Sequence, residues 1–101
     1  ADAVRLKGAV AGVNVKLEKV GGIGGALRTI HTARACGLRV MLGCFCASSV
    51  SLTMAAHLAP LADWCDLDGH LLVADDPFLG MVAPSGRIIL PAEPGLGVRP
   101  R

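Results

Sequence analysis

The sequence predicts an α/β fold in which short parallel strands alternate with helices. Residues 13–17 alternate β-branched and polar side chains, as a strand with two different faces does. A cluster of glycines follows, and apolar residues then recur at helical spacing between residues 24 and 36. A strand, a glycine turn and a helix in this order form the start of a βα unit. The rest of the chain is consistent with repetition of this unit.

The first βα unit spans residues 13–37. The apolar side chains of its strand fall on one face, whereas Asn14 and Lys16 fall on the other. In the helix predicted over 24–36, Leu27 and Ile30 are spaced to form one buried stripe. Gly37 is a natural stop for this helix, because glycine readily adopts the left-handed conformation that ends many helices.

A second unit follows directly. Residues 39–44 form a nearly continuous apolar run, which predicts a strand buried on both faces of a parallel sheet. Ser48 or Ser49 can cap a helix predicted over 50–62, with Pro60 in its last turn. Residues 64–68 then read as a third strand, which closes at Gly69.

The last part of the chain changes character. Residues 75–77 predict a turn, and segments 81–83 and 87–90 predict a hairpin around Pro84-Ser85-Gly86, followed by a loop over 91–97. The predicted order is therefore βαβαβ with an antiparallel end. Three parallel strands alone leave both sheet edges open and give the inward side chains no opposite wall. We therefore expect these residues either to be a piece of a larger fold or to assemble with other copies.

Composition excludes several functional classes. Hydrophobic residues make up 52% of the chain, and the net charge is only +2, which is too little basic excess for a nucleic-acid partner. No apolar run is long enough to span a membrane. The four cysteines, none in a C-x-x-C pair, are expected to be reduced and packed as small hydrophobic residues, with a zinc site as the alternative. Reduced thiols suggest the cytoplasm. They are Cys36, Cys44, Cys46 and Cys65.

Lys16 is the first candidate for chemistry. It lies on the polar face of its strand, near the carboxyl end, where active sites of (β/α) barrels are found. A lysine in this position can transfer protons if burial or nearby positive charge lowers its pKa. The alternative is an exposed lysine at the end of a strand.

Asp66 and Asp68 are the second candidates. They are two residues apart in the third predicted strand, so both side chains are expected on one face at its end. Two carboxylates there would attract a cation, such as an ammonium group, a guanidinium group or a metal ion. The alternative is that one carboxylate caps a turn and the other is solvated.

Taken in order, these motifs resemble the end of an enolase-superfamily barrel, in the muconate-lactonizing subgroup and closest to the dipeptide epimerases of the L-Ala-D/L-Glu type. The resemblance runs from about residue 12 to residue 98. The matching motifs are Asn14-Val15-Lys16-Leu17-x-Lys19-x-Gly21-Gly22, Met41-Leu42-Gly43-Cys44, Ala55-Ala56-His57-Leu58-Ala59, Asp66-Leu67-Asp68-Gly69, Leu71-Leu72, Asp75-Asp76-Pro77 and Pro94-Gly95-Leu96-Gly97.

The resemblance implies a fold and a set of roles. The chain would be the C-terminal portion, strands six to eight, of a (β/α)₈ TIM barrel over residues 1–76, with a C-terminal β-hairpin and tail over 77–101 that pack toward a capping domain. Lys16 would remove or return the α-proton of a dipeptide or N-acyl amino acid. Asp66 and Asp68 would hold the substrate's α-ammonium group. Mg²⁺ would be the cofactor, with its ligands upstream of residue 1, and we expect a homo-oligomer.

The sequence also departs from the family pattern. The seventh-strand loop commonly has Glu after Gly-Cys-Met-x, whereas Ala47 follows Gly43-Cys44-Phe45-Cys46 here. This leaves open dipeptides other than Ala-Glu, or another acyl amino acid. Two alternative functions also remain. One is a cycloisomerase or o-succinylbenzoate synthase-like enzyme on the same scaffold, and the other is a catalytically inactive, self-associating barrel fragment.

Overall fold

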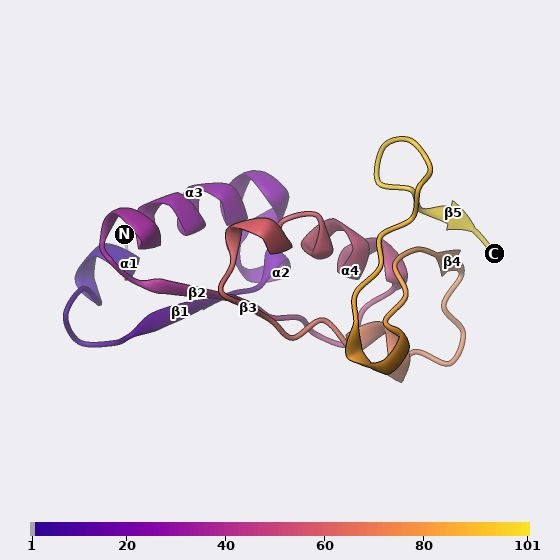
Figure 1. The fold of residues 1–101 in the computed structure, drawn as a ribbon, viewed down its shortest axis with the longest axis horizontal. Coiled ribbons are helices and arrows are strands. Elements are labelled where there is room, and N and C mark those ends of the chain that lie inside the picture. The colour runs from indigo at the N-terminus through magenta and orange to yellow at the C-terminus, as the bar shows by residue number, and fades with distance from the viewer. Residues whose placement is uncertain (1) are drawn as a thin grey trace.

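The computed structural model describes residues 2–101, which form an elongated body of 44 × 24 × 20 Å (Figure 1). Four α-helices, five short strands and three single turns of 3₁₀-helix are present in this range. In chain order they are α1 (Asp2–Arg5), β1 (Gly12–Val15), α2 (Leu17–Val20), α3 (Gly22–Ala35), β2 (Arg39–Leu42), α4 (Ser49–Ala56), η1 (Ala59–Leu61), β3 (Trp64–Cys65), η2 (Gly69–Leu72), β4 (Phe78–Leu79), η3 (Pro84–Gly86) and β5 (Arg99–Pro100).

The first three strands form one parallel sheet in the order β1-β2-β3. Val15 lies beside Leu42, and Leu42 lies beside Cys65, so the three strands reach their carboxyl ends at the same edge of the sheet. This agrees with the alternation of strands and helices predicted from the sequence. It brings together the segments that follow the three strands, which carry the predicted site residues.

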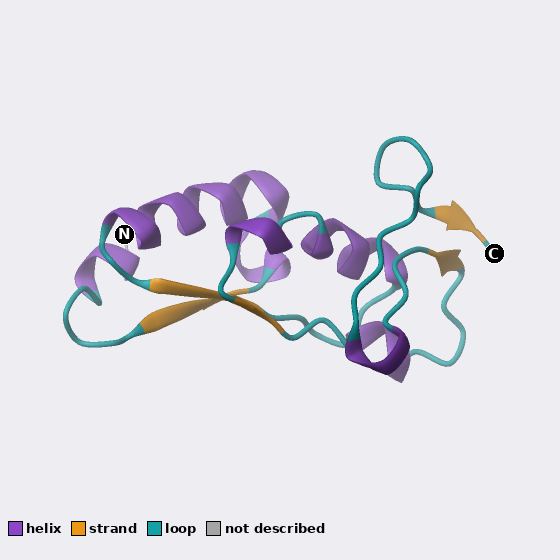
Figure 2. Cartoon of the chain, viewed as in Figure 1, coloured by secondary structure: helices purple, strands orange, loops and turns teal. Residues whose placement is uncertain are grey.

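The helices cover one face of this sheet (Figure 2). Val15, Val40 and Leu42 are fully buried beneath them, together with Ile30 of α3 and Leu52 of α4. In residues 2–101 no helix covers the opposite face, where Trp64 remains 51% exposed. The prediction that the second strand is buried on both faces is therefore wrong for this chain, because only its helix-facing side chains have a layer to pack against.

The first βα unit differs in detail from its prediction. The strand ends at Val15 rather than at residue 17, because Leu17 already begins the short helix α2 and is buried within it. Gly21 then adopts φ 82°, a left-handed conformation that ends α2 and turns the chain into α3. The longer helix consequently starts at Gly22, two residues before the predicted start.

The helix of the second βα unit, α4, is shorter than predicted. It ends at Ala56 instead of residue 62, and the separate 3₁₀ turn η1 continues the chain. Pro60 lies in η1, where its missing amide cannot support a continuous α-helix. The third strand also contains only Trp64 and Cys65, so the predicted strand over residues 64–68 is too long.

The C-terminal segment, residues 77–101, lies beyond the three-stranded sheet (Figure 1). Val82 and Ile89 exchange two backbone hydrogen bonds of 3.1 and 2.8 Å across the turn formed by η3. The antiparallel pair of β4 and β5 adds a second connection, which the sequence did not predict. This pairing brings the end of the chain back to the segment that follows η2.

Candidate active site

Lys16 is the first residue after β1 and lies at the carboxyl edge of the parallel sheet. Its backbone is still extended, with φ −121° and ψ 124°, and its side chain is half-buried. The ammonium group Nζ donates a 3.0 Å hydrogen bond to the carbonyl oxygen of Cys44, just beyond the end of β2. The alternative of a freely solvated lysine at the end of a strand is therefore wrong.

Phe45 forms a second contact with Lys16. The Nζ atom of Lys16 lies 4.6 Å from the centre of the Phe45 ring, and the Nζ atom of Lys19 lies 5.3 Å from the same ring centre. Both distances are within the range of cation–π attraction. Lys19 lies in α2, and nothing in the sequence pattern connects either lysine with Phe45.

Asp66 and Asp68 follow β3 at the same edge of the sheet. The backbone amide of Asp66 donates a 2.8 Å hydrogen bond to Leu42, which extends the β2–β3 ladder by one residue. Asp68 already has helical backbone angles at the start of η2, so the two aspartates do not share a strand as predicted. Both are exposed, and neither has an ion-pair partner within residues 2–101. Two exposed carboxylates at one edge of the sheet without counter-charges suit the binding of a cationic group.

Cys44 contacts both groups of predicted site residues. Its carbonyl oxygen accepts the hydrogen bond from Lys16, and its Sγ atom lies 3.9 Å from Oδ1 of Asp68. The four cysteines are free thiols. Cys46 and Cys65 are exposed, so the expectation that all four pack as small hydrophobic residues is wrong for these two. The segment after β2 leaves the sheet at Gly43, which places Cys46 outside the packed layer.

Two glycines allow the three strand ends to approach each other closely. A Cβ atom at Gly69 would collide with the carbonyl oxygen of Phe45, and a Cβ atom at Gly43 would lie 2.5 Å from Oδ1 of Asn14. Gly69 follows Asp68 directly, so the missing side chain lets the end of the third strand pack against the loop that carries Phe45. The same close packing holds Cys44 between Lys16 and Asp68.

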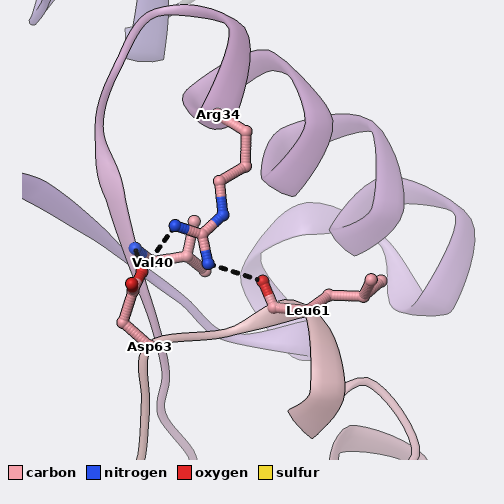
Figure 3. A network of polar contacts seen from close by, with 4 residues as sticks. All are labelled: Arg34, Val40, Leu61 and Asp63. Carbon is pink, nitrogen blue, oxygen red and sulfur yellow. Dashed lines mark hydrogen bonds and ion pairs between the residues drawn. The ribbon is translucent and has the colours of Figure 1, made fainter.

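At the opposite ends of the strands, an ionic network joins α3 to the sheet (Figure 3). The carboxylate of Asp63 accepts a 2.7 Å hydrogen bond from the amide of Val40 and pairs with the guanidinium of Arg34 at 2.8 Å. Arg34 also donates a 3.0 Å hydrogen bond to the carbonyl oxygen of Leu61. The Val40 hydrogen bond lowers the pKa of Asp63, against a smaller opposing effect of burial, and Arg34 adds to the lowering. This network ties α3 to β2 and β3 at the end away from Lys16.

Asp76 is a residue whose importance the sequence did not reveal. Its predicted position was a turn, but its carboxylate is buried at the start of α4. Oδ2 accepts a 2.7 Å hydrogen bond from the amide of Ser49, and Oδ1 accepts a 3.1 Å hydrogen bond from the amide of Phe78. Burial acts to raise the pKa of Asp76, but the hydrogen bonds from Ser49 and Phe78 outweigh it and leave the pKa lowered. Ser48 occupies the N-cap position of α4, as one of the two predicted alternatives, but its side chain makes no capping hydrogen bond. The carboxylate of Asp76, distant in sequence, binds the amide of Ser49 instead.

Within residues 2–101, no three histidine, cysteine or acidic side chains are grouped closely enough to hold a metal ion. Asp66 and Asp68 alone supply too few ligands for Mg²⁺, which prefers six oxygen ligands. The described residues therefore do not fit a complete metal site. In the same range, no helix is long and apolar enough to cross a membrane.

Comparison of the sequence with models of protein families identifies the family to which this chain belongs. The sequence model of the family described as "Enolase C-terminal domain-like" matches residues 2–101. The chain belongs to this family. In mandelate racemase and muconate lactonizing proteins this domain is the TIM barrel, which agrees with the parallel α/β sheet seen here. The resemblance found in the sequence is therefore confirmed.

Curated relatives of the chain include several epimerases. The hydrophobic dipeptide epimerase of Roseobacter litoralis is 51% identical over 89 residues, which cover 87% of this chain and 26% of that protein. The L-Ala-D/L-amino acid epimerase of Pedosphaera parvula is 46% identical over 91 residues, which cover 89% of this chain and 26% of that protein. The chain thus spans about a quarter of the length of the curated relatives that it matches.

Solved structures show the same relationship. The dipeptide epimerase from Methylococcus capsulatus, complexed with Mg and the dipeptide L-Arg-D-Lys, superposes with a TM-score of 0.89 at 35% identity, over 96% of this chain and 29% of that one. A substrate-liganded L-Ala-D/L-Glu epimerase from Bacillus subtilis gives a TM-score of 0.82 at 34% identity, over 95% and 28% of the two chains. Solved structures of dipeptide epimerases therefore contain a segment with the same fold as this chain.

Proposed function

We propose that this chain forms the C-terminal part of the barrel of a Mg²⁺-dependent dipeptide epimerase, with β1, β2 and β3 as the sixth, seventh and eighth barrel strands. The observation that carries the proposal is the placement of Lys16, Asp66 and Asp68 at one edge of a parallel sheet, where Cys44 contacts both Lys16 and Asp68. The named activities of the family relatives support the same reading.

In this proposal Lys16 is one of two acid/base groups. Acting as the base, its amine takes the α-proton of the residue that bears the substrate carboxylate. The Cα–H bond breaks, an N–H bond forms, and the electron pair delocalises into the carboxylate as an enediolate. Return of a proton on the opposite face inverts the centre, and that second base lies outside this chain. The contact of Nζ with the Cys44 carbonyl supports this role, because it fixes the amine at the edge of the sheet.

Asp66 and Asp68 recognise the α-ammonium group of the dipeptide. Both carboxylates are exposed and lack ion-pair partners within the described residues, so their charge is free to act on a substrate. The proposal favours an epimerase over a cycloisomerase or an o-succinylbenzoate synthase-like enzyme, because the substrates of those enzymes carry no ammonium group for this pair to bind.

The remaining parts of the enzyme come from outside residues 2–101. Because these residues do not form a metal site, we propose that Mg²⁺ is bound entirely by the rest of the barrel. The open face of the sheet would then pack against the missing strands, and residues 77–101 toward the capping domain. For the same reason, the 101-residue chain on its own should not epimerise dipeptides, and substantial turnover by the purified chain would contradict the proposal.

The experiment compares two substrates with the complete protein that contains this chain. One is L-Ala linked to a second amino acid, and the other is the same molecule with the α-amino group replaced by hydrogen. Asp66→Asn and Asp68→Asn should each lower kcat/KM for the dipeptide by about 30-fold or more and change it little for the amine-free analogue. Asp75→Asn, at an exposed aspartate outside the proposed site, is the matched control. Equal losses on both substrates would refute the ammonium-binding role.

A further inference from the structure

The aromatic ring of Phe45 contacts Lys16, the proposed acid/base group. It follows Cys44, whose carbonyl oxygen accepts the hydrogen bond from Lys16, and its ring centre lies 4.6 Å from Lys16 Nζ. Phe45 is 43% exposed, so the ring is not an ordinary member of the buried core. The ring therefore contacts the proposed acid/base group without being buried in the core.

We propose that Phe45 is a positioning residue for Lys16, an inference that rests on the acid/base role proposed above. A lysine side chain has four flexible bonds, and an ammonium group has three protons to donate. The Cys44 carbonyl oxygen binds one proton, and the ring of Phe45 attracts the charge from another direction. Two contacts from adjacent residues restrict Nζ to one place and leave its remaining position free to face the substrate. That position holds a lone pair when the amine takes the α-proton and a proton when it returns one.

Lys19 also lies over the ring of Phe45. Its Nζ atom lies 5.3 Å from the ring centre, so the two lysine nitrogens can be no farther apart than the sum of their distances to that centre. The two like charges repel each other, and the ring is the feature that attracts both. Lys19 is exposed, and its Nζ has no hydrogen bond or ion pair within residues 2–101, whereas Lys16 Nζ is also bonded to Cys44. Removal of the ring should therefore release both ammonium groups and let Lys16 move away from its position.

The test follows α-proton exchange in D₂O, starting separately from each epimer of the same dipeptide, with the complete protein and Mg²⁺. A lysine base exchanges its protons with solvent, so each epimer reports the base on its own face. Phe45→Leu should lower kcat for exchange of the epimer that Lys16 serves by roughly five- to a hundredfold, with KM nearly unchanged. Exchange of the opposite epimer should be much less affected. Phe45→Tyr, which keeps the ring, should restore the rate to within about twofold.

Four results would overturn the inference. If Phe45→Leu slows both epimers equally, or if Phe45→Tyr is as slow as Phe45→Leu, the ring does not act through Lys16. If Lys16→Ala abolishes exchange of one epimer while Phe45→Leu leaves it unchanged, the acid/base role stands and the positioning role falls. If Lys16→Ala slows neither epimer, the proposed function itself is wrong. A crystal structure of Phe45→Leu provides a readout besides activity, and it should show Lys16 Nζ no longer bonded to Cys44.

Discussion

The carboxylate of Asp76 binds both the backbone amide and the hydroxyl group of Ser49, which lies 27 residues earlier in the chain. A negative charge at this point favours the start of α4, because the first amides of a helix carry a partial positive charge. The backbone of Asp76 is held as well, since its carbonyl oxygen accepts a 3.0 Å hydrogen bond from Nε of Arg101. Asp76 thereby joins the C-terminal segment to the helix that follows β2.

Replacement of Asp76 by alanine should lower the free energy of unfolding by about 1–3 kcal/mol, because it leaves the buried amide of Ser49 and the partly buried amide of Phe78 without their acceptor. Urea unfolding of the complete protein measures this change. Asp75→Ala is the matched control, since Asp75 is exposed, and its effect should stay within about 0.5 kcal/mol. Equal effects of the two substitutions would show that the buried hydrogen bonds do not stabilise the fold.

The lowered pKa of Asp76 also predicts a dependence of stability on pH. Burial acts to raise this pKa, the hydrogen bonds from Ser49 and Phe78 outweigh burial, and the folded value lies below the ordinary 3.8. The stabilisation is therefore complete above the unfolded pKa and is lost as the pH falls through the folded pKa. In Asp76→Asn the difference in stability from wild type should shrink progressively below about pH 4. A difference that does not depend on pH between 7 and 3 would contradict this assignment.

Substitutions of Asp63 and of Arg34 should lower the stability of the fold by different amounts. Asp63→Ala removes both the acceptor for Val40 and the partner of Arg34, whereas Arg34→Met removes only the ion pair and the bond to Leu61. We expect a larger fall in Tm for Asp63→Ala. Because the ion pair is partly exposed, 1 M NaCl, with a screening length of about 3 Å, should remove most of the Arg34→Met effect. Thermal unfolding at low and high salt measures this, and the opposite order of the two variants would refute the account.

Gly69→Ala should disturb the site without touching a charged group. Its new Cβ would collide with the carbonyl oxygen of Phe45, so the loop that carries the Phe45 ring must move. The expected result is a loss of stability of about 1–3 kcal/mol together with a lower kcat. Gly24→Ala is a suitable control, because a Cβ there meets only the end of the flexible Arg28 side chain at 3.5 Å. Wild-type kcat and stability in Gly69→Ala would show that the close approach is unimportant.

Local patterns in the sequence predicted the parallel order of the strands and the positions of Lys16 and Asp66. Alternation of side chains and the glycines after the first strand are short-range signals, so they could be read without the fold. Contacts between distant segments could not be predicted in this way. Nothing near Asp76 indicates its bond to Ser49, and nothing near Phe45 indicates that Lys16 lies over its ring. The lengths of the strands were also missed, because the chain already enters α2 at Leu17 and η2 at Asp68.

The most direct test of the acid/base role is α-proton exchange by the Lys16→Ala variant of the complete protein, followed by ¹H NMR in D₂O with Mg²⁺ present. Lys7→Ala, at an exposed lysine far from the carboxyl edge of the sheet, controls for the loss of a positive charge. Lys16→Ala should slow exchange of one epimer by about 10²- to 10⁴-fold and leave the other epimer exchanging through the second base. Exchange of both epimers at the rate of the Lys7→Ala control would contradict the role of Lys16.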